Sequence, residues 1–134
     1  MSFASAEQGK YYLLAYIDPD VDLPNNGSWP DVQTPGSKAP ARHWVVGNIP
    51  GEDLRSGDLS KATTVSAYKG PSPPWGSHRY GQFLFEQPGL IEYETLPSPK
   101  GIYNWGYDQF IANYSLGKPV AINYHMTQHM DPRE

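Results

Sequence analysis

A loop rich in proline and glycine ends in residues that could bind an anion or move a proton. Residues 70–80 read GPSPPWGSHRY, and the three prolines, which fix φ and remove backbone donors, predict a rigid loop. Gly70 and Gly76 permit positive φ or a close backbone approach. Such a loop delivers His78 and Tyr80 together to the start of the following strand, which is one way to build a small polar pocket. The competing interpretation is a surface loop whose polar side chains are only solvated.

A pair of carboxylates, Asp18 and Asp20, lies at the end of a strongly apolar stretch, on either side of Pro19. Two nearby carboxylates can share a proton or bind a cation. Asp-Pro-Asp is also a common composition of turns and helix caps. The residues alone favour neither interpretation.

Histidines supply the other candidate acid–base groups. His43 stands at the start of a second apolar stretch, where it could donate to an anion, although a core histidine with satisfied hydrogen bonds is the commoner case. His125 and His129 are four residues apart, a spacing that chelates metal on a helix. Because this part of the chain is expected to be extended, no metal site is predicted. Ser77 beside His78 is no catalytic pair, since neighbours in a strand point to opposite faces.

Composition narrows the possible partners. The 134 residues carry a formal net charge of −4 and no cysteine, which argues against nucleic-acid binding and a polybasic membrane patch and excludes disulfides. The lack of cysteine fits a reducing compartment, and residues 1–8 lack a signal-peptide pattern. No apolar run approaches the roughly 20 residues of a membrane span. We therefore predict a cytoplasmic chain forming one domain over residues 1–134, with peripheral membrane contact at most.

The abundance of proline (14 residues) and glycine (13 residues) is typical of short strands joined by long loops, so the fold is predicted to be mainly β. Residues 21–41 have almost no hydrophobic periodicity and are predicted to form a long surface loop. An amphipathic stripe from Tyr107 to Tyr114 predicts one helix near 106–116. Apolar runs predict strands at residues 10–17, 43–49, 63–68, 82–87 and 120–124.

Three motifs in order carry a family resemblance: DPD at 18–20, RHWVV at 42–46 and the stretch 70–80. The run 105–120 adds a helix-then-strand segment. Together they resemble the phosphatidylethanolamine-binding protein family, which includes the Raf kinase inhibitor proteins and the plant flowering-time regulators. The resemblance covers nearly the whole chain from Gly9 onward.

The resemblance implies a large central antiparallel sheet with a small anion-binding pocket at one end, which takes phosphate-like groups such as phospholipid head groups. It implies no cofactor, no metal and no catalytic residue. Histidine and tyrosine donors suit phosphoryl oxygens, while the carboxylates can accept from an ammonium group. The ligand-binding residues expected on this basis are Asp18, Asp20, His43, Gly70, Pro73, Pro74, Gly76, His78 and Tyr80.

The function implied is non-catalytic binding of a phosphate-type ligand such as phosphoethanolamine, with regulation of a protein partner such as a kinase or a protease. Two alternatives stay open. One is an acid–base hydrolase that uses the same aspartates and histidines. The other is a structural subunit of a larger assembly.

The chain also departs from the family pattern. Arg42 stands where animal members place a second histidine, and residues 21–41 make a long insertion. Family members usually have further strands before the first motif and often a terminal helix beside the pocket, and this chain is expected to lack both. An open sheet edge, and self-association through it, are therefore expected.

Overall fold

The computed structural model describes residues 5–18, 40–69, 76–98, 101–102 and 105–129. These residues form a mainly β fold, as the sequence predicted, with short helices at α1 and α2. The elements in chain order are β1 (Tyr11–Asp18), β2 (Ala41–Pro50), α1 (Gly51–Ser56), β3 (Thr63–Ser66), β4 (Gly76–Glu86), α2 (Tyr107–Asn113) and β5 (Ala121–His129).

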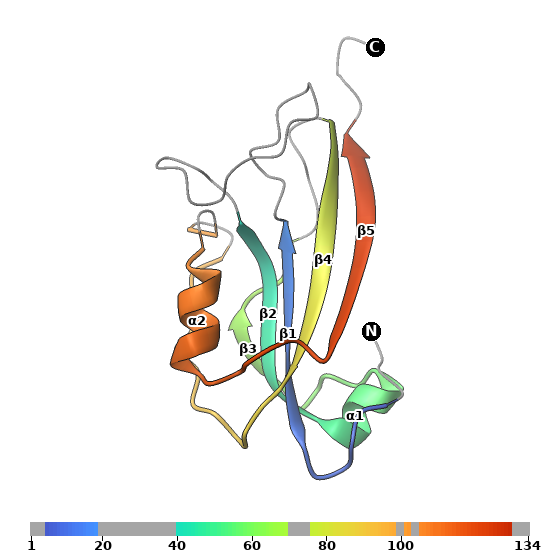
Figure 1. The fold of residues 1–134 in the computed structure, drawn as a ribbon, viewed down its shortest axis with the longest axis vertical. Coiled ribbons are helices and arrows are strands. Elements are labelled where there is room, and N and C mark those ends of the chain that lie inside the picture. Colours follow the sequence, from blue (N-terminus) through green and yellow to red (C-terminus); the bar gives the residue numbers. More distant parts are fainter. Residues whose placement is uncertain (1–4, 19–39, 70–75, 99–100, 103–104, 130–134) are drawn as a thin grey trace.

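The strands form one antiparallel sheet in the order β3-β2-β1-β4-β5 (Figure 1). β1 lies at the centre, and seven of its eight positions, Tyr12 to Asp18, are buried. This burial explains why its sequence is apolar at almost every position instead of alternating: side chains on both faces of the strand are covered.

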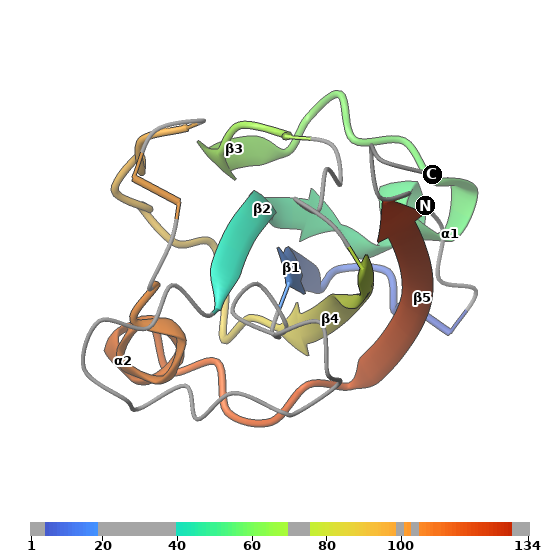
Figure 2. The same cartoon turned by 90° about the horizontal axis from the view of Figure 1, so that it is seen from above.

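Each face of the sheet has its own apolar cluster. One face packs against α2 and the segments around it (Figure 2), through buried residues that include Leu13, Phe85, Trp105 and Phe110. The opposite face packs near α1 through residues that include Tyr12, Leu14, Val46, Leu54 and Leu84. Alternate residues of β1 thus enter different clusters, as expected for a strand between two layers.

Several predicted boundaries were wrong. β4 begins at Gly76, so Gly76–Tyr80 belong to the strand and not to the preceding loop, and β5 continues to His129. The two extensions pair with each other from Gly76↔His129 onward, and a partner so distant in the chain leaves no local signal. The helix α1, which begins at Gly51 directly after β2, was not predicted because it is too short to show a clear period. Of the predicted loop 21–41, residues 21–39 lie outside the described residues, and Ala41 begins β2.

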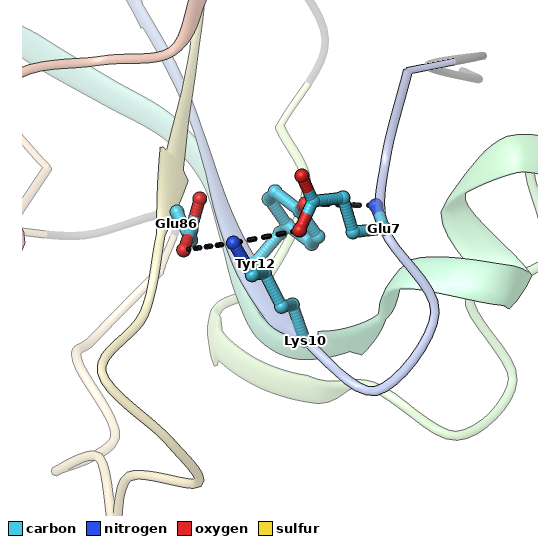
Figure 3. A network of polar contacts seen from close by, with 4 residues as sticks. All are labelled: Glu7, Lys10, Tyr12 and Glu86. Atoms are coloured by element: carbon cyan, nitrogen blue, oxygen red, sulfur yellow. Dashed lines mark hydrogen bonds and ion pairs between the residues drawn. The ribbon is translucent and has the colours of Figure 1, made fainter.

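The segment before β1 is tied to the sheet by the polar network in Figure 3. Lys10 Nζ lies 2.7 Å from a Glu7 carboxylate oxygen and 3.0 Å from one of Glu86. The hydrogen bond to Glu7, followed by that to Glu86, raises the pKa of Lys10. The backbone N–H of Glu7 donates to the Tyr12 hydroxyl at 2.9 Å. Because the ion pairs are exposed, they fix the path of the chain more than they stabilise it.

A network of amide hydrogen bonds holds the irregularity of β2 at Asn48. The β1–β2 register shifts here, and Asn48 has a φ of 53°. Its N–H donates to Oε1 of Gln87, and the Gln87 amide donates back to Oδ1 of Asn48, both at 2.8 Å. The Ile91 N–H also donates to Oδ1 of Asn48, at 2.9 Å. The segment after β4 is therefore fastened to β2.

Replacing Asn48 with alanine is expected to lower the free energy of unfolding by about 3 kcal/mol. Loss of its side chain leaves the buried amide of Gln87 short of a partner, at a cost of about 1–3 kcal/mol. A positive φ adds about 1 kcal/mol for alanine. Asn48→Gly loses the same hydrogen bonds without that strain, so it should be about 1 kcal/mol milder. Urea denaturation measures both variants, and equal losses would show that the positive φ carries no strain.

No helix among the described residues is long and apolar enough to cross a bilayer.

Candidate ligand-binding site

Three of the predicted site residues come from neighbouring strands to one end of the sheet. Asp18 ends β1, and because Ile17 pairs with Gly81, Asp18 lies next to Tyr80 on β4. His43 comes from β2. All three are buried, with exposed fractions of 2% for Asp18, 5% for His43 and 1% for Tyr80. The sheet register therefore brings together a carboxylate, an imidazole and a phenol that are far apart in the sequence.

A bulge in β2 directs His43 toward this cluster. Tyr16 pairs with Trp44 and Ile17 pairs with Arg42, which leaves His43 without a residue opposite it on β1. The His43 ring meets the Tyr80 ring edge-on, with centroids 5.1 Å apart, and lies 6.0 Å from the Tyr16 ring. Without the extra residue, strict alternation would turn His43 to the other face of the sheet.

The hydrogen bond of His43 sets its tautomer. Its Nδ1 lies 2.9 Å from the backbone carbonyl oxygen of Lys69. Because a carbonyl only accepts, Nδ1 carries a hydrogen. The Nδ1 atom is thus satisfied, as expected for a core histidine.

Tyr16 and His125 extend the site toward β5. The Tyr16 hydroxyl lies 2.7 Å from Nε2 of His125, and the His125 ring stacks on the Tyr80 ring at 5.5 Å and 18°. Burial, followed by the nearby Tyr68 and Asp18, raises the pKa of Tyr16 to about 12. The Tyr16 hydroxyl therefore keeps its proton at neutral pH, within hydrogen-bond distance of His125 Nε2.

Tyr16 and His125 were not predicted from the sequence as site residues. His125 was considered only as part of a metal pair with His129, and both lie on β5 rather than on a helix. His125 is identified by the β4–β5 register of the structure, in which it pairs with Tyr80. Within the described residues there is no group of three or more metal-ligating side chains.

Arg42 lies next to His43 in the chain but serves the other face of the sheet. Its Nε donates to the Ser66 hydroxyl at 2.9 Å and its Nη2 to the carbonyl oxygen of Pro97 at 2.6 Å. The guanidinium also lies 5.8 Å from the centre of the Trp105 ring. Burial lowers the pKa of Arg42. Its positive charge therefore holds the backbone at Pro97 and at Gly101, on the face opposite His43.

Two further predicted residues, Gly76 and His78, lie on β4. Gly76 begins this strand, and His78 pairs with Thr127 of β5, two positions beyond the Tyr80–His125 pair. The other predicted site residues, Asp20, Gly70, Pro73 and Pro74, lie outside the described residues.

The arrangement combines an imidazole and a phenol with the buried carboxyl group of Asp18. Imidazole and phenol groups donate to phosphate oxygens, and a carboxylate accepts from an ammonium group. These groups lie at one end of a five-stranded antiparallel sheet.

A family model for phosphatidylethanolamine-binding proteins matches residues 1–125. The chain belongs to this family. Among its relatives is Protein MOTHER of FT and TFL1 homolog 2 of Oryza sativa subsp. japonica, which is 32% identical over 124 residues. The match covers 92% of this chain but only 64% of that relative, so the chain spans less than two thirds of the relative's length.

Solved structures share the fold of this chain. The solution structure of CG7054 is 31% identical and superposes with a TM-score of 0.65, covering 97% of this chain and 69% of that one. The carboxypeptidase Y inhibitor, solved with its cognate proteinase, has a TM-score of 0.63 at 17% identity and covers 92% of this chain and 62% of that one. At this low identity the second likeness shows the fold alone.

Proposed function

We propose that this family member binds a small ligand that carries a phosphate group, such as the head group of a phospholipid, and regulates a protein partner without catalysing a reaction. The observation that carries the proposal is the convergence of Asp18, His43 and Tyr80 at one end of the sheet. Each comes from a different strand, and each was expected at the ligand from the family motifs.

The mixture of groups favours a zwitterionic head group over a simple anion. In this proposal the phosphate accepts hydrogen bonds from the imidazole of His43 and the hydroxyl of Tyr80, while Asp18 accepts from the ammonium group. From the family motifs we also expect His78 to act as a donor, and we expect five more residues at the ligand: Asp20, Gly70, Pro73, Pro74 and Gly76. Phosphoethanolamine is a small molecule that presents both a phosphate and an ammonium group.

Titration of the chain with phosphoethanolamine, followed by amide NMR, tests ligand binding. We expect saturable shifts of the backbone signals of His43, His78 and Tyr80, with inorganic phosphate binding more weakly because it leaves Asp18 without its ammonium partner. Saturable binding of phosphate alone would retain an anion site but remove the role proposed for Asp18. A dispersed spectrum that does not move with either compound would contradict the proposal.

Replacing Tyr80 with phenylalanine is expected to weaken phosphoethanolamine binding about tenfold. The change keeps the ring that packs on His43 and His125 but removes the donor, and a hydrogen bond to a charged group is worth about 1.5–3 kcal/mol. Tyr107→Phe is the matched control, because Tyr107 packs with Phe85 on the opposite face. Isothermal titration calorimetry measures both dissociation constants. Equal affinities of the two variants would exclude the Tyr80 hydroxyl from the site.

The proposed protein partner requires a separate test. A proteinase is one candidate class, since a protein with the same fold, the carboxypeptidase Y inhibitor, was solved with its cognate proteinase. A kinase is the other candidate class. Addition of the purified chain to carboxypeptidase Y, and to a panel of kinases, with activity as the readout, tests this part of the proposal. Unchanged activity throughout would remove enzyme inhibition and leave ligand binding to stand alone.

A further inference from the structure

The two edge strands of the described sheet differ in how they are protected. β3, at one edge, has only four residues, and Leu96 adds backbone contacts to it: its N–H donates to the Val65 carbonyl oxygen at 2.7 Å, and it forms a bridge with Ser66. Short and covered edges are a common means by which proteins avoid pairing with other chains.

β5, at the other edge, has none of these protections. It runs for nine residues, all of them paired to β4, and no described strand pairs with its other side (Figure 1). Its sequence, AINYHMTQH, contains no lysine, arginine, aspartate, glutamate or proline, which are the residues that normally blunt an open edge. Two of its large apolar side chains are exposed, Ile122 at 52% and Tyr124 at 46%.

We propose that β5 pairs antiparallel with β5 of a second copy of the chain, so that the two sheets become one continuous sheet. The chain carries a net charge of −4, yet this edge is free of formally charged residues, so two copies meet there without bringing like charges together. A positively charged partner would have no negatively charged residue on this strand to pair with. Two-fold symmetry limits the assembly to a dimer, because the β5 edge of each chain is then occupied by the other.

A two-fold axis through Tyr124 gives the register in which apolar residues pair with apolar residues and polar residues with polar ones. It sets Tyr124 opposite its own copy, Ile122 opposite Met126, and Asn123 opposite His125. Antiparallel pairs preserve the face of each residue, so apolar positions meet on one face of the joined sheet and polar positions on the other.

A nine-residue strand spans roughly 30 Å. Edge pairing alone buries less than the roughly 1,200 Å² of a standard interface, so we expect a dissociation constant of about 10 μM or weaker.

Sedimentation velocity over protein concentrations from about 1 μM to about 1 mM tests the dimer. The wild-type chain should pass from monomer to dimer across this range and go no further. Ile122→Lys places a charge at the exposed edge and should keep the chain monomeric, whereas Leu90→Lys, at a residue 68% exposed in a loop, should dimerise like the wild type. A monomer at all concentrations overturns the proposal, as does a dimer that Ile122→Lys leaves unchanged.

Single cysteines identify the register, because the natural chain has none. Opposed residues of antiparallel strands have Cβ atoms about 4.5–5.5 Å apart, close enough for oxidation to link them. Tyr124→Cys should form a disulfide-linked dimer readily. Asn123→Cys mixed with His125→Cys should link better than either variant alone, and Leu90→Cys should not link. Absence of a link in every β5 variant, in chains that retain the wild-type NMR dispersion, overturns the pairing even where a dimer exists.

Discussion

Replacement of His43 by phenylalanine is expected to weaken phosphoethanolamine binding about 100-fold. The aromatic packing against Tyr16 and Tyr80 survives the change, since a benzene ring fills nearly the same space. Both ring nitrogens are lost, however, and with them the charge-assisted hydrogen bond to the phosphate, worth about 1.5–3 kcal/mol. We expect a larger loss than for Tyr80→Phe, because the Lys69 carbonyl oxygen also loses its donor. Isothermal titration calorimetry at neutral pH measures the loss.

Two conservative variants separate ligand binding by His43 from a purely structural role. Asparagine places an amide nitrogen near the position of Nδ1, so His43→Asn can restore the bond to the Lys69 carbonyl oxygen without a group at Nε2. Glutamine places its amide near the position of Nε2. If Nε2 contacts the ligand, His43→Gln binds more tightly than His43→Asn. The reverse order would show that His43 only positions the Lys69 segment.

Replacement of Gly51 by alanine is expected to lower the free energy of unfolding by about 3 kcal/mol, which corresponds to a melting temperature lower by about 10 °C. A Cβ at this position would lie 1.8 Å from the carbonyl oxygen of Glu7 and 2.7 Å from its carbonyl carbon. The Gly51 N–H also donates to the Lys10 carbonyl oxygen at 2.8 Å. The new methyl group can be accommodated only if the segment before β1 moves away, which withdraws the buried Ala6 from its apolar cluster.

Gly89→Ala is the matched control for Gly51→Ala, because no atom lies within 4 Å of the Cβ that it would add. Its free energy of unfolding should change by no more than about 0.5 kcal/mol. Guanidinium denaturation measures both variants, with hydrogen exchange at Ala6 to Lys10 as a local readout. If Gly51→Ala lowers the free energy of unfolding by less than about 1 kcal/mol, the segment before β1 moves aside at little energetic cost.

The elements with local signals were predicted well. The apolar run of β1, the second apolar run at β2 and the amphipathic stripe of α2 each express a local requirement, because burial on both faces or on one stripe limits which side chains a segment can carry. The helix α1 was missed because six residues with only Gly51 and Leu54 buried give no detectable period. The extensions of β4 and β5 were missed because each depends on the other.

The amino-acid sequence by itself determined the family, the mainly β class and the types of group expected at the site, because these follow from residue identities in a fixed order. Tertiary structure decided where those groups point. The β2 bulge turns His43 toward Tyr80, and the β4–β5 register brings His125 to Tyr16, a residue 109 positions away in the chain. Strand pairing is a contact between distant segments, and a shift of one residue reverses the face of every side chain. The family motifs in the sequence therefore proposed Asp18, His43 and Tyr80, whereas the geometry that joins them was set by pairings that no local stretch encodes.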